Sequence, residues 1–279
     1  MAAVRGGPVY KGMGKLPDRA LLVLSVFIYL FLYAPIAIVI FFSFNDAKST
    51  QNWAGFSTRW YGELIRDQTV LDAFYNSMIV GVTATAIATV IGTLTALALS
   101  RNDFRGKTFA DSAIYAATVM PEIVVGVSLL VFFVAAQIGL GITTIIIAHV
   151  AFTISFVTIV VRARLSGMDR SIEEAAQDLG ASPVQTFLRV TLPLILPGVM
   201  AGALLAFTLS FDDFVITFFV SGVGSSTLPL KIYSMLKFGV TPVINALSTI
   251  VVFTTLVIIL GAGRFFAGGD DLKNARKDS

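Results

Sequence analysis

Long apolar segments alternate with short polar ones along most of the chain. Residues 20–44 form the first apolar run, and a bilayer core needs about 20 apolar residues per helix. By that measure, further spans are expected at 72–100, 108–136, 142–162, 195–220 and 243–266. The first run is longer than the roughly 7–15 residues of a signal-peptide core and has no cleavage site after it, so we interpret it as a retained span. The pattern therefore predicts an all-α membrane protein with six transmembrane helices.

One polar stretch, Arg170 to Arg189, interrupts this pattern between the fourth and fifth spans. Ser171 and Glu174 have capping-box spacing, which predicts a helix start. Gly180 can take the left-handed conformation that ends a helix, and Ser182-Pro183 offers an N-cap followed by proline at the first helical position. We expect two short helices with a glycine corner.

The basic residues are distributed unevenly between alternate loops. If the N-terminus is cytoplasmic, the inner segments hold all but five of the 20 lysines and arginines. The five on the outer side are Lys48, Arg59, Arg66, Lys231 and Lys237. This positive-inside bias predicts that both termini and the polar stretch face the cytoplasm.

Composition agrees with a membrane protein and excludes several function classes. The 279 residues are 56% hydrophobic and 13% charged, with a mean hydropathy of +0.84, which does not fit a soluble protein. Without cysteine and with one histidine, the chain lacks the residues for a thiolate or histidine metal centre, and we expect no metal site. It also has no G-x-x-x-x-G-K-[ST] phosphate loop, so another chain must bind any nucleotide that supplies energy.

Two further segments are expected on the outer side. The loop from Asn45 to Leu71 carries aromatic residues suited to the headgroup region or to an external partner, and we leave both readings open. A break at 221–226 precedes a short amphipathic segment, 228–239, that could lie in the membrane interface. The aromatic residues of the loop are Trp53, Phe56, Trp60 and Tyr61.

The polar stretch resembles a motif of a known family. Glu174-Ala-Ala-x-x-x-Gly180, followed after nine residues by Val190-x-Leu192-Pro193, is similar to the EAA motif of permease subunits of ATP-binding-cassette importers. The family pattern has isoleucine at the place of Val190. The resemblance implies the type I importer permease fold, in which region 168–193 forms a coupling helix that sits in a groove of a cytoplasmic ATPase. The alternative is a solvated hairpin. The implied coupling residues are Glu173, Glu174, Ala175, Ala176, Asp178, Gly180, Leu192 and Pro193.

Other motifs resemble the spermidine/putrescine-type permeases, most of all the second, smaller subunit of the pair. They are Tyr33-Ala-Pro35, Ser57-Thr-Arg-Trp-Tyr61, Ser210-Phe-Asp-Asp-Phe214, Thr227-Leu-Pro229 and Gly239-Val-Thr-Pro-x-Ile-Asn-Ala246. The resemblance implies a polyamine substrate. Opines, amino acid derivatives, phosphonates and iron remain open, because related permeases are expected to serve them.

The resemblance also implies an organisation and a set of partners. Residues 1–19 and 267–279 would be cytoplasmic tails around a permease domain at 20–266. The partners would be a second homologous permease subunit, two cytoplasmic ATP-binding subunits, an external substrate-binding protein and the lipid bilayer of the bacterial inner membrane, with no nucleic acid. The chain would have no catalytic residues and bind no cofactor, since ATP and magnesium would bind to the partner ATPase.

Ionisable residues inside spans are costly in lipid and therefore usually face the interior of a helix bundle. Asp213 and Glu122 are the first candidates for the substrate path, and bonding to neighbouring helices or holding a gate is the alternative for both. Asp212 and Asp213 are expected to be successive on one helix, about 100° apart, so that at most one faces the path. His149 is also a path candidate, but a hydrogen-bonded packing role suits it better.

Some patterns receive a structural interpretation. The phenylalanines at 207, 211, 214 and 218 are expected to form one packing stripe, and Pro121 and Pro197 to kink their helices. Gly198-x-x-x-Gly202 permits close helix contact, with a dimer seam as a weaker reading.

Two other functions fit the sequence less well. A membrane-embedded enzyme would need a nucleophile or metal set, and H-E-x-x-H and G-x-S-x-G are both absent. A self-sufficient channel or secondary transporter often shows two related halves, and this chain shows no internal similarity.

Overall fold

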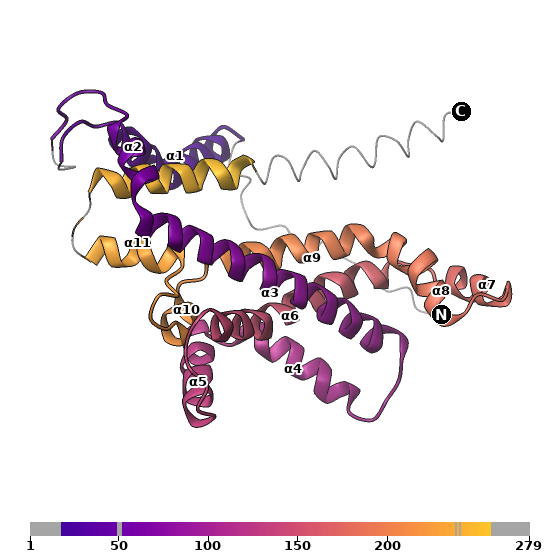
Figure 1. Cartoon of the computed structure of the whole chain (residues 1–279). Helices are drawn as coiled ribbons and strands as arrows, with labels where there is room; N and C mark the ends of the chain where they lie inside the picture. Colours follow the sequence, from indigo (N-terminus) through magenta and orange to yellow (C-terminus); the bar gives the residue numbers. More distant parts are fainter. Residues whose placement is uncertain (1–17, 49–51, 238, 240, 258–279) are drawn as a thin grey trace, which may run out of the picture. The chain divides into compact units, whose positions relative to one another are not determined.

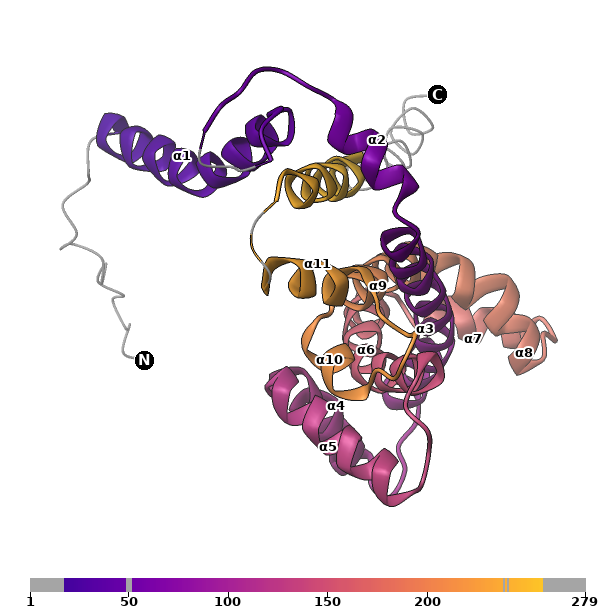
Figure 2. The same cartoon turned by 60° about the vertical axis from the view of Figure 1, so that its left-hand side comes forward.

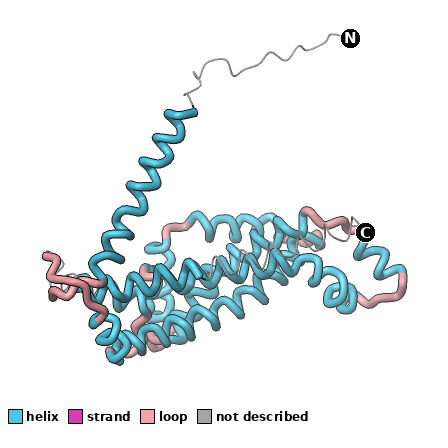
Figure 3. Tube along the Cα trace, turned by 90° about the horizontal axis from the view of Figure 1, so that it is seen from above, coloured by secondary structure: helices cyan, strands magenta, loops and turns pink. Residues whose placement is uncertain are grey.

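The computed structural model describes residues 18–48, 52–237, 239 and 241–257. Within that part the chain is almost entirely helical and has no strand, only an isolated bridge between Asn45 and Phe56 (Figure 3). The chain divides into two compact units, which we describe separately. Unit 1 comprises residues 1–62 and 241–255, and unit 2 comprises residues 63–240 and 256–279.

The helices follow one another with short connections. Unit 1 holds α1 (Asp18–Ser43), the start of α2 (Arg59–Arg66) and most of the helix Pro242–Val257. Unit 2 holds α3 (Gln68–Arg101), α4 (Lys107–Val119), α5 (Glu122–Ala135), α6 (Ile142–Ser166), α7 (Ser171–Asp178), α8 (Pro183–Thr186), the π-helix η1 (Phe187–Thr191), α9 (Leu192–Asp212), α10 (Val215–Val220) and α11 (Leu228–Lys237).

In the part of the chain that the structure describes, four helices are long and apolar enough to cross a membrane, namely Arg19–Ser43, Gln68–Arg101, Ile142–Ser166 and the continuous run Pro183–Asp212. A fifth span results if α4 and α5 are counted together. Helix Pro242–Val257 is shorter, and the rest of the predicted sixth span, up to residue 266, lies outside the described residues. The all-helical membrane architecture is confirmed, whereas the count of six stays a prediction.

The third predicted span is broken rather than kinked. Helices α4 and α5 meet at an angle of 111°, so 108–136 is not one continuous helix. Pro121 has no N–H to continue the hydrogen bonding of α4, and it disfavours helical geometry at the preceding residue. Met120 accordingly has extended geometry, with ψ at 129°. The apolar length of the segment was predicted correctly, but its direction was not.

The fifth predicted span, 195–220, differs from the observed helix at both ends. Helix starts at Pro183 and passes through one π turn, η1, into α9. Pro193 explains the π turn, because its ring would clash with the carbonyl of Arg189 in a regular α-helix. The helix then ends at Asp212, and a short connection precedes α10.

Helices α3, α6 and α9 lie side by side and form the core of unit 2 (Figures 1 and 2). Small residues make this close approach possible. A Cβ added at Gly92 of α3 would lie 2.8 Å from Cβ of Val157 on α6. Thr158 also donates a hydrogen bond to the Gly92 carbonyl, at 3.3 Å. The buried members of this cluster are Ala88, Ala96, Val157, Val161, Leu165, Ile195, Val199 and Ala206.

The two glycines of Gly198-x-x-x-Gly202 pack inside the chain. Gly198 lies against the aliphatic part of the Arg164 side chain. A Cβ added at Gly202 would lie 3.4 Å from Cγ1 of Val157. The Arg164 guanidinium donates to the carbonyl of Leu194. The face of this motif is therefore occupied by α6, which excludes it as a seam between two copies.

A second buried cluster joins α3, α5, α6 and α10. Its members are Val80, Phe133, Ile145, Ala148, Phe152, Ile216 and Val220. The predicted phenylalanine stripe is not continuous, because α9 ends at Asp212, between Phe211 and Phe214. Phe207 stacks on Phe211 within α9, and Phe214 packs on Tyr233 of α11, with ring centroids 4.5 Å apart.

In unit 1, the chain after α1 folds back on the end of that helix. The indole nitrogen of Trp60 donates to the carbonyl of Asn45 at 2.6 Å, and Trp60 is buried. The hydroxyls of Tyr61 and Ser43 are 2.7 Å apart. Trp53 stacks on Phe41 and remains 44% exposed. Trp60 and Tyr61 therefore hold the loop together, while Trp53 and Phe56 are the aromatic residues left at its surface.

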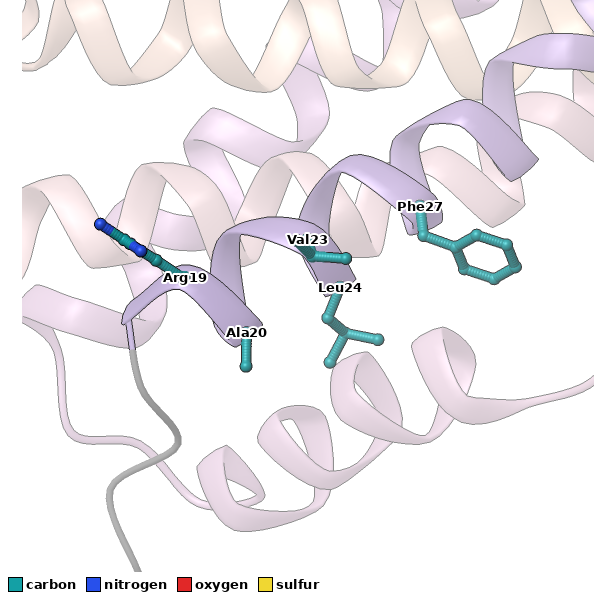
Figure 4. A pocket seen from close by; sticks show the side chains of 5 residues that line it. All are labelled: Arg19, Ala20, Val23, Leu24 and Phe27. Atoms are coloured by element: carbon teal, nitrogen blue, oxygen red, sulfur yellow. The ribbon is translucent and has the colours of Figure 1, made fainter.

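A shallow hollow on α1 is lined by Arg19, Ala20, Val23, Leu24 and Phe27 (Figure 4). All five side chains come from one helix, so the hollow has a single wall. We assign it no ligand.

The contact at Gly92 gives a direct test of the core. We expect Gly92→Ala to destabilise the protein by about 1–3 kcal/mol, because its methyl group would overlap Val157. Thermal unfolding in detergent measures the effect. Gly62→Ala is the control, since nothing lies within 4 Å of the added Cβ there. Equal melting temperatures for the two variants would contradict the packing described.

Candidate functional site

The polar stretch forms the expected hairpin of two short helices, α7 and α8. Gly180 has φ at +88°, the left-handed conformation that ends α7. Ser182 caps α8 in a capping box, in which its Oγ accepts from the Gln185 N–H and Gln185 Oε1 accepts from the Ser182 N–H. Pro183 is the first residue of α8. The glycine corner and the second cap are therefore confirmed.

The predicted capping box at the start of α7 is wrong. Arg170 occupies the cap position without a side-chain hydrogen bond, and the Ser171 N–H donates instead to the Asp169 carboxylate at 3.0 Å. This bond lowers the pKa of Asp169 below its ordinary value. The bond is present when the carboxylate is ionised and is lost as pH falls through that lowered pKa. An acidic residue two positions before the helix thus displaces Ser171 as the cap.

The outer surface of the hairpin combines charge with apolar side chains. Of the predicted coupling residues, Glu174, Ala175, Asp178 and Gly180 are exposed, while Ala176 is half-buried. Sequence reasoning missed Leu179, which is 90% exposed at the corner, and Val184, which is 65% exposed. Apolar residues beside the turn glycine of a polar hairpin were the signal that could have found them.

Glu173 faces the opposite way and is held inside the chain. Its Oε2 lies 3.0 Å from Nε of Arg101, the last residue of α3, and its Oε1 accepts from Oγ1 of Thr191 at 2.7 Å. Leu192 and Pro193 follow directly as the first residues of α9. These positions therefore belong to the junction between hairpin and membrane helix.

A second candidate site lies where two helices are broken. The break at Pro121 is followed by α5, and the break at Asp213 is followed by α10. These helices pack closely, since a Cβ added at Gly126 would lie 2.8 Å from the Phe219 ring and 3.3 Å from Cα of Ile216. Non-helical backbone at membrane depth is tolerated where it is buried in protein or lines a water-filled cavity.

Two carboxylates are presented at these breaks. Glu122, the first residue of α5, and Asp212, the last residue of α9, are both exposed. Because α5 packs on α10, the structure brings together two helix breaks whose acidic residues, Glu122 and Asp212, are about 90 positions apart in the sequence.

Asp213 is buried and bonded within the chain. Its oxygens accept from the N–H of Ile216 at 3.2 Å and from the N–H of Thr217 at 2.8 Å, so it caps the start of α10. The Thr217 hydroxyl lies 2.9 Å from the same carboxylate. Asp213 itself has extended backbone, with ψ at 125°, because α9 ends before it. The sequence pattern predicted that the two aspartates follow each other on one helix, and this prediction is wrong.

His149 of α6 joins this buried network from the other side. Its Nε2 lies 3.2 Å from Asp213 and 3.0 Å from the Thr217 hydroxyl, and its Nδ1 lies 2.7 Å from the Ser210 hydroxyl. A carboxylate only accepts hydrogen bonds, so Nε2 carries a hydrogen. The network connects α6 to both sides of the break between α9 and α10.

Among the described residues no group of three or more His, Cys, Asp or Glu side chains is placed to hold a metal ion.

The comparisons with known proteins decide the family. Residues 88–263 match the family described as binding-protein-dependent transport system inner membrane component. The chain belongs to this family. The match covers more than half of the chain and includes both the hairpin and the paired helix breaks.

Curated relatives cover most of the chain. It is 46% identical over 230 residues to the putrescine transport system permease protein PotI of Escherichia coli (strain K12), covering 80% of this chain and 82% of that protein. It is 44% identical over 235 residues to the spermidine/putrescine transport system permease protein PotC of the same strain, covering 84% and 89%.

Solved structures with little sequence similarity share the fold. A bacterial alginate ABC transporter in complex with an alginate pentasaccharide-bound periplasmic protein matches with a TM-score of 0.69 at 19% identity, covering 88% of this chain and 91% of that one. The MetNI methionine ABC transporter matches with a TM-score of 0.58 at 18% identity, covering 76% and 99%. The fold is thus that of importer permeases.

The contrast between the two aspartates can be tested by stability. We expect Asp213→Ala to cost about 1–3 kcal/mol, because it leaves His149 and the N–H groups of Ile216 and Thr217 without their partner. Asp212→Ala, at an exposed position, should stay within about 0.5 kcal/mol of the parent. Thermal unfolding of both variants in detergent measures the difference. Equal losses would show that Asp213 does not brace the break.

Proposed function

We propose that this chain is the permease subunit of an ATP-driven importer and forms half of a translocation path. A second homologous permease subunit would form the other half. Two cytoplasmic ATP-binding subunits would drive the cycle, and an external binding protein would deliver the substrate. The hairpin is the observation that carries the proposal, because it presents a compact, well-capped surface outside the long apolar helices.

The exposed surface of the hairpin suits a groove on an ATPase subunit. Leu179 and Val184 can enter apolar pockets, while Glu174 and Asp178 can form charge-assisted hydrogen bonds at the rim. On this proposal, closure of two ATPase subunits would move the hairpins and switch the path between inward-facing and outward-facing states. Both termini and the hairpin would then lie in the cytoplasm.

Nucleotide chemistry would belong entirely to the partner subunits. The sequence has no phosphate loop, and we propose that ATP and magnesium bind to the ATPase alone. The chain would then bind no cofactor of its own and would contribute positioning and motion rather than catalysis.

We propose a polyamine as the substrate class. The named relatives transport putrescine, or spermidine and putrescine, and cover most of the chain. Polyamines carry ammonium groups at neutral pH, and exposed carboxylates in a path raise the local concentration of cations. Asp212 and Glu122 are exposed at the paired helix breaks, so we place them in the path and assign Asp213 and His149 to bracing it.

The hairpin proposal predicts a loss of assembly. Leu179→Asp and Glu174→Lys should each lower ATP-dependent uptake by at least about tenfold, since a charge is desolvated or reversed at the contact. Co-purification of the ATPase subunits with the membrane-inserted permease should fall in parallel. Leu179→Met keeps an apolar side chain and serves as the control. Normal uptake and co-purification in both charged variants would contradict the proposal.

The acidic pair predicts a separate defect. We expect the double variant Asp212→Asn, Glu122→Gln to lower uptake of radiolabelled putrescine by about tenfold, because the path loses two negative charges. The ATPase subunits should still co-purify. Asp72→Asn, which removes an exposed carboxylate from α3, is the matched control. Unchanged putrescine uptake would remove these residues from the path and leave the hairpin proposal standing.

A further inference from the structure

We propose that Glu173 is a positioning residue that holds the hairpin against the C-terminal end of α3, so that movement of the hairpin is transmitted along α3. We call the contacts of Glu173 and Arg170 with Arg101, and of Glu173 with Thr191, the clasp. The inference rests on the proposed function for its consequence in transport. The clasp itself is a set of contacts within one chain.

Both oxygens of Glu173 are engaged, each by a different element. Oε2 pairs with the Arg101 guanidinium at the end of α3, and Oε1 accepts from Thr191 at the end of η1. The side chain is only 13% exposed, in a hairpin whose other acidic residues are exposed. An ion pair shielded from water in this way is screened less by salt than one on the surface.

A second contact fixes the same joint. The Arg170 guanidinium, just before α7, donates to the backbone carbonyl of Arg101 at 3.1 Å. Arg101 thus contacts the hairpin region twice, through its side chain at Glu173 and through its backbone carbonyl at Arg170. Two contacts at different atoms restrain rotation as well as separation, so the hairpin cannot swing about a single bond.

In its N-terminal half, α3 is hydrogen-bonded to the segment after α10. Asn76 donates to the carbonyls of Gly224 and Ser226, at 3.2 and 3.0 Å. The Leu228 N–H donates to the Ser77 hydroxyl at 2.8 Å. At about 1.5 Å per residue, the part of α3 from Asn76 to Arg101 spans roughly 38 Å. One helix therefore links the hairpin to the connection that follows the broken helix.

The neighbouring residue provides a sharp contrast. Glu174 is one position along α7, about 100° around the helix, and is exposed. We therefore assign Glu174 to the contact with the ATPase and Glu173 to the clasp within the permease. Replacing each with glutamine should produce two different defects.

A distance measurement tests the clasp directly. Because the natural chain has no cysteine, single cysteines at Gln177 on the hairpin and Leu94 on α3 can carry spin labels without background. Both positions are exposed. In the full-length protein in lipid nanodiscs, we expect one narrow distance distribution. Glu173→Gln and Arg101→Gln should each broaden it, and Glu174→Gln should leave it narrow.

A transport measurement tests the consequence. In the assembled complex we expect Glu173→Gln to lower the number of substrate molecules imported per ATP hydrolysed by roughly tenfold, since an ionised partner is lost. The ATPase subunits should co-purify at the parental level. Thr191→Val should add little to Glu173→Gln, because the two residues share one contact.

Two results would overturn the proposal. One is a distance distribution that Glu173→Gln leaves unchanged. The other is a variant that lowers only the amount of folded permease and keeps the parental ratio of import to hydrolysis, as a merely stabilising residue would. If the parent chain captures no ATPase, the proposed function fails, and the distance measurement still decides whether the clasp exists.

Discussion

A helix that breaks at membrane depth must find new partners for the backbone groups that it frees, because lipid offers none. This constraint explains the region around Asp213. The carboxylate replaces the missing turn of helix at the start of α10, and His149 and Thr217 in turn satisfy the carboxylate. That network stabilises the change of direction beside α6. Three buried polar side chains therefore stabilise the break between α9 and α10. The break in turn determines where the exposed side chain of Asp212 lies.

Close packing of α3, α6 and α9 supplies the fixed frame for this arrangement. Gly92 and Gly202 both approach Val157, and Gly198 makes room for the stem of Arg164. Because glycine has no side chain, the backbones of α3 and α9 can each come close to α6. The hairpin and the paired breaks lie toward opposite ends of this three-helix frame (Figure 1).

Local rules made the hairpin predictable. Gly180 and Ser182-Pro183 each satisfy a backbone requirement within a few residues, and the structure shows them as expected. The cap at Asp169 was missed because two acceptors competed for one N–H and the sequence did not rank them. The helix breaks were missed for a different reason. Apolar length reports how many residues can lie in a membrane, and it says nothing about the direction that they take after Pro121 or Asp213.

The candidate residues show a related limit of sequence reasoning. Leu179 was overlooked because a single apolar residue in a polar stretch has no periodicity to reveal it. Asp212 and Asp213 were expected to follow each other on one helix, but α9 ends between them, and this end decides which of the two is buried. That end is fixed by buried partners on α6 and α10, which are 64 residues before Asp213, at His149, and four residues after it, at Thr217. Only the folded chain can show which of the two is bonded.

Each functional region divides a pair of adjacent acidic residues between two tasks. In the hairpin, Glu173 bonds inward to α3 while Glu174 faces outward. At the helix break, Asp213 bonds inward to α6 and α10 while Asp212 is exposed. The inward carboxylate fixes the local backbone, and this fixes the position from which its neighbour can act. The exposed carboxylate, which we propose contacts a partner subunit or a cation, thus gains its placement from a neighbouring carboxylate that is bonded within the chain.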